Sequence, residues 1–426
     1  MKLLVRFGDL MLKGKNKKIF INSLNKHVSK KFSDLDVIVD KRHDRLYLEF
    51  NEELKSEIEK RIMQIPGIHS YSVVYDADKN IESIVKKAIE VLNIELNNDK
   101  EYTFKVETKR SDKSFEYLSN DFTRAVAPLI LKESDKKLLV DVKNPEVVLN
   151  INIRTEGAYL YLTSKLALGG FPATIAGRGL LMMSGGIDSP VSAFLAIKQG
   201  IEIELLHFES SPLTPLESVN KVHDLATKLA VFLPNEKIKL HVVPFMKLHE
   251  QLLNNVSESY VITIMRRMMY RIAERFANER SIKVLVNGES VGQVASQTLS
   301  SIKVVENVTN IPVLRPVITY DKKEIMDIAE RIDTFKISIK PFNDCCSIYV
   351  PKNPVISPTI EKAEFEESKF DYNLFIDETM KNIKTIVVSK NSVRDFSMYG
   401  FTFLEAYENM ENEKWLYLKI MKQLNI

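Results

Sequence analysis

The spacing of hydrophobic positions changes along the chain and indicates where separate folding units lie. At the start, "KLLVRFG" has the pattern of a strand, and apolar residues from Ile21 to Phe32 recur at helical spacing. "VIVDKRHDRLYLEF" predicts two short strands around a polar turn, and "EELKSEIEKRIMQI" predicts a second helix that ends at Pro66-Gly67. Residues 1–75 are therefore predicted to form a small α+β sandwich.

A second unit is predicted for residues 76–166. "SIVKKAIEVL" and "NDFTRAVAPLILKE" have helical spacing, and "YTFKVETKR" lies between them as a strand. "PEVVLNINIRTEGAYLYL" reads as a hairpin that turns near Glu156-Gly157. The stretch "ALGGFPATIAGRG" that follows is rich in glycine and alanine, so residues 167–178 are predicted to be a linker.

From Leu180 onward the pattern becomes one of repeated strand–helix pairs. The candidate strands are "GLLMMS", "IEIELLHF", "IKLHVVPF" and "IKVLVNGE", with helical stretches between them. Such alternation is typical of a parallel sheet covered by helices on both faces. It predicts an α/β domain over residues 179–390, and residues 391–426 are predicted to be a helical extension of unknown role.

Composition narrows the class of protein. The chain has 426 residues, of which 45% are hydrophobic and 27% charged, as in an ordinary globular protein. No apolar run approaches the roughly 18 residues of a membrane span, and the N-terminus has charges where a secretory signal needs an apolar core. A cytoplasmic protein is expected. The two cysteines, Cys345 and Cys346, are adjacent and build no disulfide framework.

Charge is distributed unevenly. The net charge is +3, yet residues 1–50 hold twelve Lys or Arg and six Asp or Glu, so that segment carries +6 and the rest −3. A basic segment on a nearly neutral protein favours a polyanionic partner. A solvated lysine-rich surface is the other interpretation that charge leaves open.

The stretch "LMMSGGIDSP" carries the strongest chemical signal. It lacks the lysine of a Walker A loop, and its adjacent glycines do not fit the dinucleotide pattern. Gly185 and Gly186 allow the backbone to approach a phosphate closely. Ser184, Ser189 and the free N–H groups of the following helix are donors for the same anion.

Asp188 indicates what kind of phosphate group the turn can bind. A carboxylate repels a bare phosphate, but a Mg²⁺ ion that bridges the two makes the arrangement favourable. The turn therefore suits the pyrophosphate of ATP as a leaving group, which indicates adenylation. The alternative is a tight strand–helix turn with a serine cap.

These residues resemble the PP-loop of ATP pyrophosphatases. Three further parts of the chain resemble the tRNA 4-thiouridine synthetase family: "VRFGDLMLKGKNKKIF" its start, "VETKRSDKSF" and "VDVKNPEVVLNINIRTEGAYLY" its THUMP domain, and "MRRMMYRIAERFA" with "VNGESVGQVASQTLSSI" its catalytic core. Phe7-Gly8-Asp9 stands where the family has Tyr-Gly-Glu. No cysteine follows Cys346, so the chain resembles the shorter type without a rhodanese-like domain.

The resemblance implies a multidomain fold and an activity. The fold is an N-terminal ferredoxin-like domain, a THUMP domain that binds tRNA, and a PP-loop ATP pyrophosphatase domain. The activity is adenylation of O4 of a tRNA uridine, at position 8, followed by sulfur transfer that gives 4-thiouridine and AMP. The implied partners are tRNA, a cysteine desulfurase as persulfide donor, and a second copy of the chain in a homodimer. Residues expected to bind tRNA are Lys13, Lys15, Lys109, Arg110 and Lys113.

The same resemblance places the ATP site. It comprises Met182, Met183, Ser184, Gly185, Gly186, Asp188, Ser189, His207, Phe208, Arg266, Gly288 and Gln297. The methionines are expected to contact adenine through backbone, Arg266 to reach a phosphate and Gln297 to offer its amide. Gly288 is expected to leave room for the nucleotide. Taken singly, each of these residues has an ordinary interpretation in the core or on the surface.

The adjacent cysteines are expected to carry the sulfur. They lie in "PFNDCCSIYVPKNP", which reads as a loop. Cys346 is the first choice for the persulfide. The alternative is that Cys345 accepts the sulfur instead; otherwise Cys345 resolves the intermediate. The two can close a vicinal disulfide that a reductant reopens. Two cysteines are too few for a three-cysteine iron–sulfur cluster in one subunit and lack zinc spacing, so no resident metal site is expected.

Two rival functions remain open at this point. A PP-loop enzyme with another nucleophile, such as ammonia, would be active without Cys345 and Cys346. A tRNA-binding protein with a degenerate loop would have no catalysis, but the intact turn at 184–189 argues against that.

Overall fold

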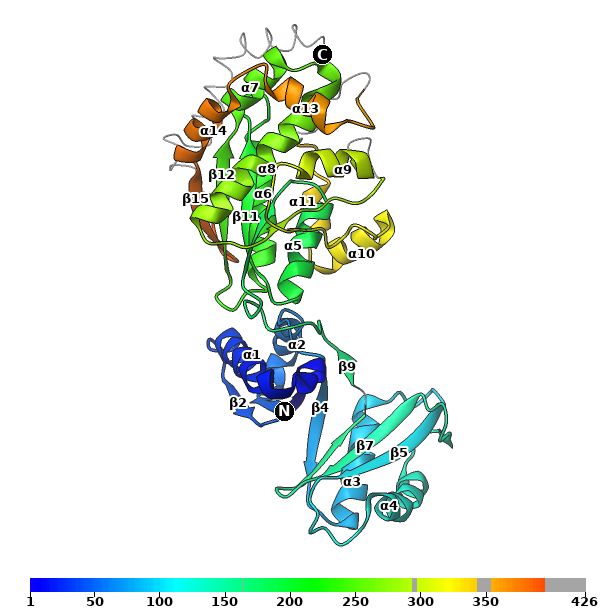
Figure 1. Ribbon diagram of the computed structural model, residues 1–426. Helices are drawn as coiled ribbons and strands as arrows, with labels where there is room; N and C mark the ends of the chain where they lie inside the picture. The colour runs from blue at the N-terminus through cyan, green and yellow to red at the C-terminus, as the bar shows by residue number, and fades with distance from the viewer. Residues whose placement is uncertain (163, 293–296, 343–353, 395–426) are drawn as a thin grey trace. The chain divides into compact units, whose positions relative to one another are not determined.

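The computed structural model describes residues 1–162, 164–292, 297–342 and 354–394 (Figure 1). Its contacts divide the chain into two compact units, Met1–Pro172 and Ala173–Ile426, which are described separately. The expected cysteine loop, with Cys345 and Cys346, and nearly all of the expected helical extension lie outside the described residues.

The first unit begins with the expected α+β arrangement. Strands β1 (Lys2–Arg6), β2 (Val37–Lys41), β3 (Arg45–Phe50) and β4 (Ser70–Ala77) pair antiparallel in the order β2-β3-β1-β4. Helices α1 (Lys17–Lys31) and α2 (Lys55–Ile62) cover one face, and short helical turns lie at Gly8–Leu12, Gly14–Asn16 and Glu52–Leu54. The apolar positions that predicted these elements form one buried cluster, so the ferredoxin-like prediction is confirmed.

Strand β4 continues into the second half of this unit. Its first residues pair with β1, and Tyr75–Ala77 pair with β8 (Ala158–Tyr161). The sheet extends through β7 (Val147–Ile153), β5 (Tyr102–Arg110) and β6 (Leu138–Val140), while β9 (Lys165–Leu166) pairs with β4. Helices α3 (Ile81–Glu95) and α4 (Ser119–Glu133) pack on it. The domain boundary predicted after residue 75 thus falls inside a strand.

A small cluster joins the two halves of the sheet. Leu4, Tyr47 and Val74 pack against Tyr159, and the rings of Tyr47 and Tyr159 stack with centroids 5.5 Å apart. Because all four side chains are buried, the halves share a core besides the strand that they share.

The second unit is built on a six-stranded sheet. Strands β10 (Arg178–Met182), β11 (Glu202–Glu209), β12 (Lys237–Pro244), β13 (Leu285–Val286) and β14 (Val313–Leu314) are parallel, in the order β14-β13-β10-β11-β12. This confirms the predicted parallel sheet. An antiparallel edge strand that we did not predict, β15 (Lys384–Ser389), pairs with β12. Its β-branched run from Thr385 to Val388 is typical of a strand, but its antiparallel pairing depends on β12, which lies far away in sequence.

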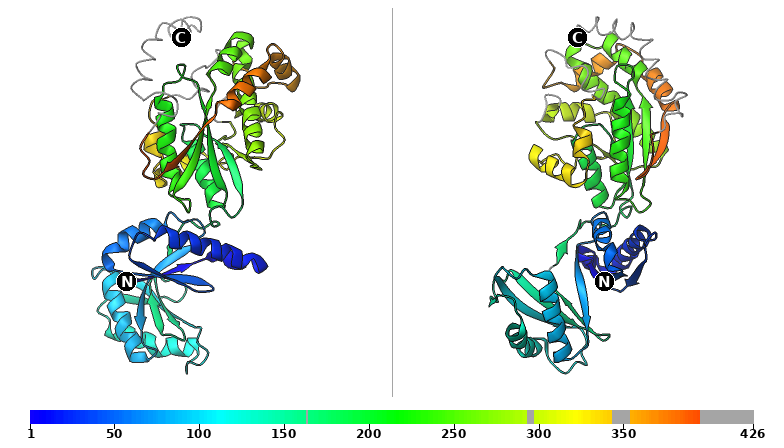
Figure 2. Two further views of the ribbon diagram at one scale, coloured as in Figure 1. Left: turned by 90° about the vertical axis from the view of Figure 1, so that its left-hand side faces the viewer. Right: turned by 180° about the vertical axis from the view of Figure 1, so that it is seen from behind.

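Helices cover both faces of this sheet (Figure 2). Helices α5 (Asp188–Lys198) and α6 (Glu217–Ala230) pack on one face; α7 (Met246–Asn255), α8 (Val261–Glu279) and α14 (Tyr372–Lys381) pack on the other. The remaining elements are α9 (Leu299–Glu306), α10 (Lys322–Arg331), α11 (Phe335–Ser338), α13 (Ile360–Glu367) and a helical turn at Glu258–Tyr260. Within the described part of the chain, no helix has the length and apolar character that a bilayer span requires.

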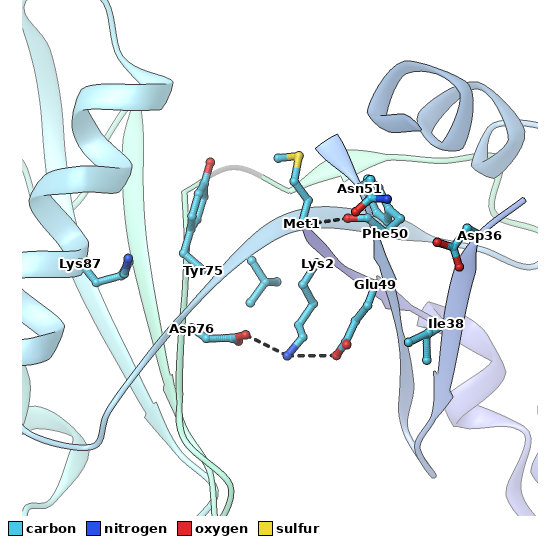
Figure 3. A pocket seen from close by; sticks show the side chains of 11 residues that line it. Met1, Lys2, Asp36, Ile38, Glu49, Phe50, Asn51, Tyr75, Asp76 and Lys87 are labelled. Carbon is cyan, nitrogen blue, oxygen red and sulfur yellow. Dashed lines mark hydrogen bonds and ion pairs between the residues drawn. The ribbon is translucent and has the colours of Figure 1, made fainter. Parts of the chain in front are cut away.

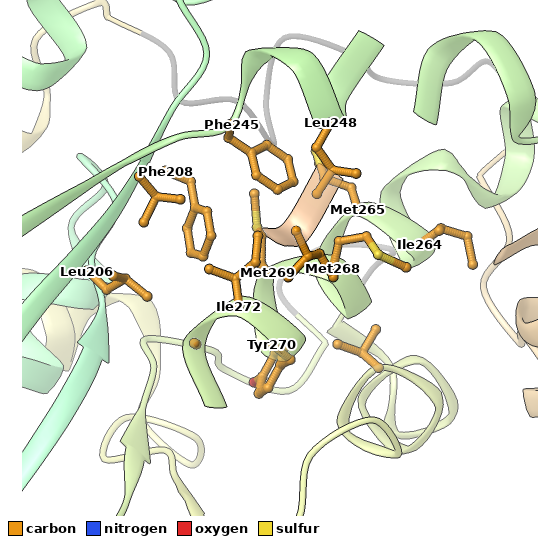
Figure 4. Close-up of a cluster of buried hydrophobic side chains, with 14 of the residues drawn as sticks. Leu206, Phe208, Phe245, Leu248, Ile264, Met265, Met268, Met269, Tyr270 and Ile272 are labelled. Atoms are coloured by element: carbon orange, nitrogen blue, oxygen red, sulfur yellow. The ribbon is translucent and has the colours of Figure 1, made fainter. Parts of the chain in front are cut away.

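A methionine-rich core supports the carboxyl end of the sheet (Figure 4). Met265, Met268 and Met269 of α8 pack with Phe208 of β11 and Phe245, all of them buried. The rings of Phe208 and Phe245 meet edge to face at 5.4 Å. Methionine fills irregular space well, so this core fixes the strand ends from which the candidate site is built.

Candidate active site

The turn at residues 184–189 connects the end of β10 to the start of α5. The hydroxyl of Ser189 donates to the carbonyl oxygen of Ser184 at 2.9 Å and accepts the backbone N–H of Ser184 at 3.1 Å. The backbone N–H of Gly186 lies 3.3 Å from the Ser184 hydroxyl. Ser189 is only 3% exposed, so its hydroxyl shapes the turn. We had expected it to donate to the phosphate, but its proton is engaged with Ser184.

Two glycines of the site serve different purposes. A β carbon at Gly186 would meet only the Ser184 hydroxyl, at an ordinary 3.5 Å, so the fold itself leaves space there. A β carbon at Gly288 would lie 2.6 Å from the backbone nitrogen of Ser189 and 2.8 Å from the carbonyl carbon of Asp188. Gly288 therefore lies against the backbone of the turn, which by itself requires a glycine at this position. That Gly288 also leaves room for a nucleotide stays a prediction.

Asp188 is the first residue of α5 and has a cationic neighbour that the sequence did not reveal. The ammonium of Lys322, the first residue of α10, lies 2.9 Å from its carboxylate. The two residues are 134 positions apart, so no local motif links them. The pair places a positive charge at the mouth of the turn, where the phosphates of a nucleotide would need one.

His207 and Met183 hold two neighbouring strand ends together. The Nδ1 atom of His207 lies 3.0 Å from the carbonyl oxygen of Met183, and the backbone N–H of Met183 donates to the carbonyl of Leu206 at 2.7 Å. Since a carbonyl only accepts, Nδ1 carries a proton and donates it to Met183. Both backbone groups of Met183 therefore already have a hydrogen-bond partner inside the protein.

Arg266 lies inside a buried network and not on a solvated face. It forms an ion pair with Glu289, which also accepts from Arg315 at 2.9 Å and from Asn287 at 2.7 Å. Arg315 in turn contacts Glu306 at 2.7 Å. Glu289 directly follows Gly288, so this network stands beside the turn. Neither Glu289 nor Arg315 was expected from the sequence.

The other residues predicted for the ATP site contribute mainly to packing and to the local backbone. The side chain of Phe208 is core, which leaves only its backbone for a nucleotide. Met182 is partly buried against the same core. The backbone oxygen of Gln297 accepts from Gly292 at 3.2 Å, and its side-chain oxygen is buried with no hydrogen-bond partner among the described residues.

The residues expected to bind RNA lie in the first unit, and only Lys109 lines a described cavity. The cavity has a volume of about 270 Å³, and Arg6, Arg45 and His69 line it too. Asp44 offsets part of their charge because it pairs with Arg45. The result is a recess with more basic than acidic groups, which suits a phosphate-bearing ligand.

The neighbouring loop "SDKSF" presents Lys113 to solvent while other residues brace it. Asp112 is buried and accepts from Lys79 at 2.9 Å and from the backbone and hydroxyl of Ser114. Hydrogen bonds from Ser114 and then Lys79 lower the pKa of Asp112 to about 2. Arg110 donates to the carbonyl of Phe115 at 3.0 Å, so its guanidinium supports the loop as well.

Lys13 and Lys15 lie apart from that cavity, in the helical turns after β1. The ammonium of Lys13 sits 3.9 Å from the centre of the Phe171 ring and 5.4 Å from that of Phe20. Lys15 is exposed.

A second and larger cavity in this unit has balanced charges (Figure 3). It measures about 480 Å³, and Asp36, Glu49 and Asp76 line it together with Lys2, Lys87 and the N-terminal residue Met1. The Lys2 ammonium is shared between Glu49 at 3.2 Å and Asp76 at 2.9 Å, and the Met1 ammonium donates to the carbonyl of Phe50 at 2.6 Å. Because this lining has no excess of basic groups, the smaller cavity suits a phosphate better.

Three family models match the chain. They are described as "Thiamine biosynthesis protein (ThiI)", "ThiI ferredoxin-like domain" and "THUMP domain", and they cover residues 174–372, 2–72 and 78–163. A protein of Acholeplasma laidlawii named "Probable tRNA sulfurtransferase" is 52% identical over 411 residues, which span 96% of this chain and 99% of that protein. A protein of the same name from Macrococcus caseolyticus is 42% identical over 393 residues, 92% of this chain and 96% of that protein.

Solved structures agree with the sequences. The crystal structure of a 4-thiouridine synthetase–RNA complex with bound ATP is 31% identical, covers 91% of this chain and 99% of its own, and superimposes with a TM-score of 0.82. Protein PH1313 of Pyrococcus horikoshii, 19% identical with a TM-score of 0.58 over 78% of this chain and 99% of its own, shares the fold. Full-length identity to curated relatives, together with the PP-loop turn, settles the family: the chain belongs to the tRNA sulfurtransferases.

Proposed function

We propose that this protein thiolates a tRNA uridine, at position 8, in an ATP-dependent reaction in the cytoplasm. The turn at 184–189 carries the proposal, since its fold leaves open space at Gly186 beside the N-terminus of α5. Helix N-termini favour anions, so the pyrophosphate of ATP fits there. In-line attack by O4 of the uridine on the α-phosphate then releases pyrophosphate and leaves an adenylated base.

Asp188 and Lys322 divide the charge of the leaving group between them. The Asp188 carboxylate is partly exposed and suits Mg²⁺, which prefers one or two carboxylates and completes its shell with phosphate oxygens and water. When bound, Mg²⁺ neutralises charge on the pyrophosphate. The Lys322 ammonium is placed to contact a phosphate oxygen.

Arg266 and His207 orient the nucleotide. Arg266 is held by Glu289 close to Gly288, within reach of a phosphate if it changes partner. His207 fixes the end of β11 against Met183, where adenine would meet the backbone of residues 182, 183 and 208. Gln297 offers a side-chain oxygen that lacks a hydrogen-bond partner among the described residues.

Transfer RNA binds through the first unit. Lys109 and its basic neighbours in the cavity contact the phosphate backbone, and Lys13, Lys15, Arg110 and Lys113 extend the interface. The uridine leaves its stack to reach the second unit. In a homodimer, the first unit of one copy serves the active site of the other.

The cysteines supply the sulfur. A cysteine desulfurase transfers a sulfur atom to Cys346, which becomes a persulfide. Its terminal sulfur attacks C4 of the adenylated uridine; the C4–O bond breaks and AMP leaves. The Cys345 thiolate then attacks Sγ of Cys346, which releases 4-thiouridine and forms a disulfide, and a thiol reductant reopens that disulfide with two electrons.

A reconstituted assay tests the proposal. Protein, ATP, Mg²⁺, unmodified tRNA, cysteine and a desulfurase are combined, and digested nucleosides are identified by mass. We expect 4-thiouridine from the wild type and its loss in Cys346→Ser, with Cys345→Ser as the parallel variant.

Every other result of this assay would contradict a particular step of the proposed mechanism. Pyrophosphate release on tRNA without thiolation would leave the adenylating site standing and make the sulfur source or the nucleophile wrong. Thiolation that survives in both serine variants would remove the cysteines from the mechanism. If the assay shows neither pyrophosphate release nor thiolation, the result would favour a tRNA-binding protein without catalysis.

A further inference from the structure

Glu289 is a buried carboxylate that two arginines share beside the turn at 184–189. It is 8% exposed, forms an ion pair with Arg266 and accepts from Nε of Arg315 at 2.9 Å. Both arginines are largely buried too, since the side chain of Arg266 is 12% exposed and that of Arg315 is 10% exposed. One negative charge therefore holds two positive charges in a region that water scarcely reaches.

Three separate segments bring these groups together. Arg266 lies on α8, Glu289 comes three residues after the end of β13, and Arg315 directly follows β14. Because β13 and β14 are neighbouring parallel strands, their carboxyl ends lie at one edge of the sheet, where the backbone N–H of Asn287 donates to the carbonyl of Leu314 at 3.0 Å. The two arginines thus reach Glu289 from different elements, so one can leave without moving the other.

The other groups that contact Glu289 are neutral. The side-chain amide of Asn287 donates to Oε2 of Glu289 at 2.7 Å and to the hydroxyl of Tyr270 at 2.5 Å. Tyr270 is buried, and burial raises the pKa of its hydroxyl, so the group stays uncharged. Without a cation, Glu289 would be a buried charge held by neutral donors, which is strongly unfavourable.

Arg315 is held by a second carboxylate as well. Its Nη2 atom donates to Glu306 at 2.7 Å, and the Glu306 side chain is 36% exposed and therefore partly hydrated. Two carboxylates on different elements thus fix the guanidinium of Arg315 at Glu289. This arrangement keeps a cation at Glu289 whatever the position of Arg266.

A shift of Arg266 to a phosphate would carry a penalty at Glu289. Arg266 must give up its ion pair to make this shift, and loss of one partner from a buried pair is strongly destabilising because an uncompensated charge remains. With Arg315 in place, Glu289 keeps a cation and the penalty is small. Without Arg315, the carboxylate would either hold Arg266 back or be left with neutral donors.

We propose that Arg315 is a positioning residue for ATP binding: it stays paired with Glu289 and so allows Arg266 to turn to a phosphate of the nucleotide. This inference rests on the proposed function, in which Arg266 contacts ATP. The effect of Arg315 on ATP affinity should then depend on both Glu289 and Arg266, whereas a residue that only supports the fold would act without them.

Equilibrium binding of ATP with Mg²⁺ to the full chain, measured by calorimetry, tests the inference. Arg315→Met is compared with the conservative variant Arg315→Lys, and melting temperatures are recorded for every variant. Arg271→Met is the matched control, because Arg271 shares another buried carboxylate, that of Glu367, with Arg267.

Two double variants test the exchange of partners itself. Arg315→Met combined with Glu289→Gln removes the charge that Arg315 is proposed to balance. Arg315→Met combined with Arg266→Met removes the guanidinium that is proposed to move. Glu289→Gln and its double variant leave no carboxylate at this position, so they remain informative even if Arg315→Met alone does not fold.

We expect Arg315→Met to weaken ATP binding at least about tenfold, and Arg315→Lys to weaken it less because lysine retains a cation. In the Glu289→Gln or the Arg266→Met background, the same change should alter ATP affinity by less than about twofold. Glu289→Gln alone should bind ATP at least as tightly as wild type, since no carboxylate then holds Arg266 back. Arg271→Met should match wild type.

Several results would overturn the inference. ATP affinity of Arg315→Met within twofold of wild type would remove the residue from ATP binding. A loss that persists in both double variants, or an equal loss in Arg271→Met, would show a merely structural role, and a tenfold loss in Glu289→Gln would contradict the exchange. If Arg266→Met alone binds ATP as wild type does, the role of Arg266 in the proposed function fails instead.

Discussion

The turn proposed to bind the phosphates of ATP and the surface proposed to bind RNA differ in how they are built. In the second unit, the turn at 184–189 is fixed by buried hydroxyls and by backbone that packs against Gly288. In the first unit, Lys109, Lys113 and Lys15 are exposed, and the buried contacts lie beneath them, as with Asp112. The contacts of the turn depend on one another, so a single substitution there should abolish most of its activity. Exposed cations contribute separately, so single changes there should have small and graded effects.

The largest effect is expected from Asp188→Asn. This change removes the carboxylate proposed to hold Mg²⁺ and leaves Lys322 unpaired, so ATP-dependent pyrophosphate release should fall by about 10²- to 10³-fold, the range typical for loss of an electrostatic contact to a developing charge. Asp327→Asn, on the exposed face of α10, is the control and should behave as wild type. Activity within tenfold of wild type would exclude Asp188 from the reaction.

The two glycines offer the next test. Gly288→Ala would place a β carbon 2.6 Å from the Ser189 nitrogen, so the turn must move and pyrophosphate release should drop by about a hundredfold. Gly186→Ala has room inside the protein, and its melting temperature should match wild type while ATP binding weakens about tenfold. Equal behaviour of the two variants, in melting and in ATP affinity, would contradict the different roles that the structure gives them.

Lowering the pH should destabilise the second unit because a buried histidine becomes protonated when the protein unfolds. Burial lowers the pKa of His249, which is 1% exposed, to about 4, while an unfolded histidine titrates near 6.5. Between these values the unfolded state binds more protons, so stability present above about pH 6.5 is lost as the pH falls toward 4. From pH 7 to pH 5 the free energy of unfolding should decrease by roughly 2 kcal/mol through this group.

Chemical denaturation of wild type and His249→Gln at both pH values measures that contribution. The variant should show a smaller decrease between pH 7 and pH 5 by about that amount. A decrease identical to that of wild type would mean that His249 does not titrate as its burial implies.

The smallest effect is expected on the RNA-facing surface. Lys109→Ala should weaken tRNA binding about three- to fivefold and reduce the slope of log affinity against log salt by about 0.7 to 0.9, since one phosphate contact is lost. Pyrophosphate release at saturating tRNA should not change. Lys2→Ala, in the larger cavity whose charges are balanced, is the control, and a larger effect there than at Lys109 would place the RNA contacts in the larger cavity instead.

Much of the site could be anticipated because its signals are local. The spacing Ser184-Gly185-Gly186 with Asp188 and Ser189 predicted a phosphate-binding turn between strand and helix, and the structure places β10 and α5 there. Gly288 was expected in the site on resemblance alone, and only the coordinates show that the backbone of residues 188 and 189 approaches it.

Residues joined by long-range contacts could not be found in this way. Lys322 and Asp188 are 134 positions apart, and Lys221 and Lys340 are 119 apart. In sequence, Lys221 looks like one more polar residue of an amphipathic helix. Arg267 looks like part of a solvated basic pair, yet it is 1% exposed and held by two hydrogen bonds to Glu367. The sequence around a single charged residue does not indicate whether folding will bring an oppositely charged partner next to it.

The sequence by itself determined the alternation of strands and helices, the parallel sheet, the α+β start and the glycine turn between β10 and α5. These depend on periodicity and on neighbouring residues, which are physical properties of a local stretch of chain. The tertiary structure alone decided that one strand joins the halves of the first unit and that an antiparallel strand pairs at the edge of the sheet of the second. It also decided that Lys322 meets Asp188 and that Glu289 meets Arg266 beside the turn. Such placements arise only when distant segments pack, because burial and pairing are properties of the folded core and not of any one segment.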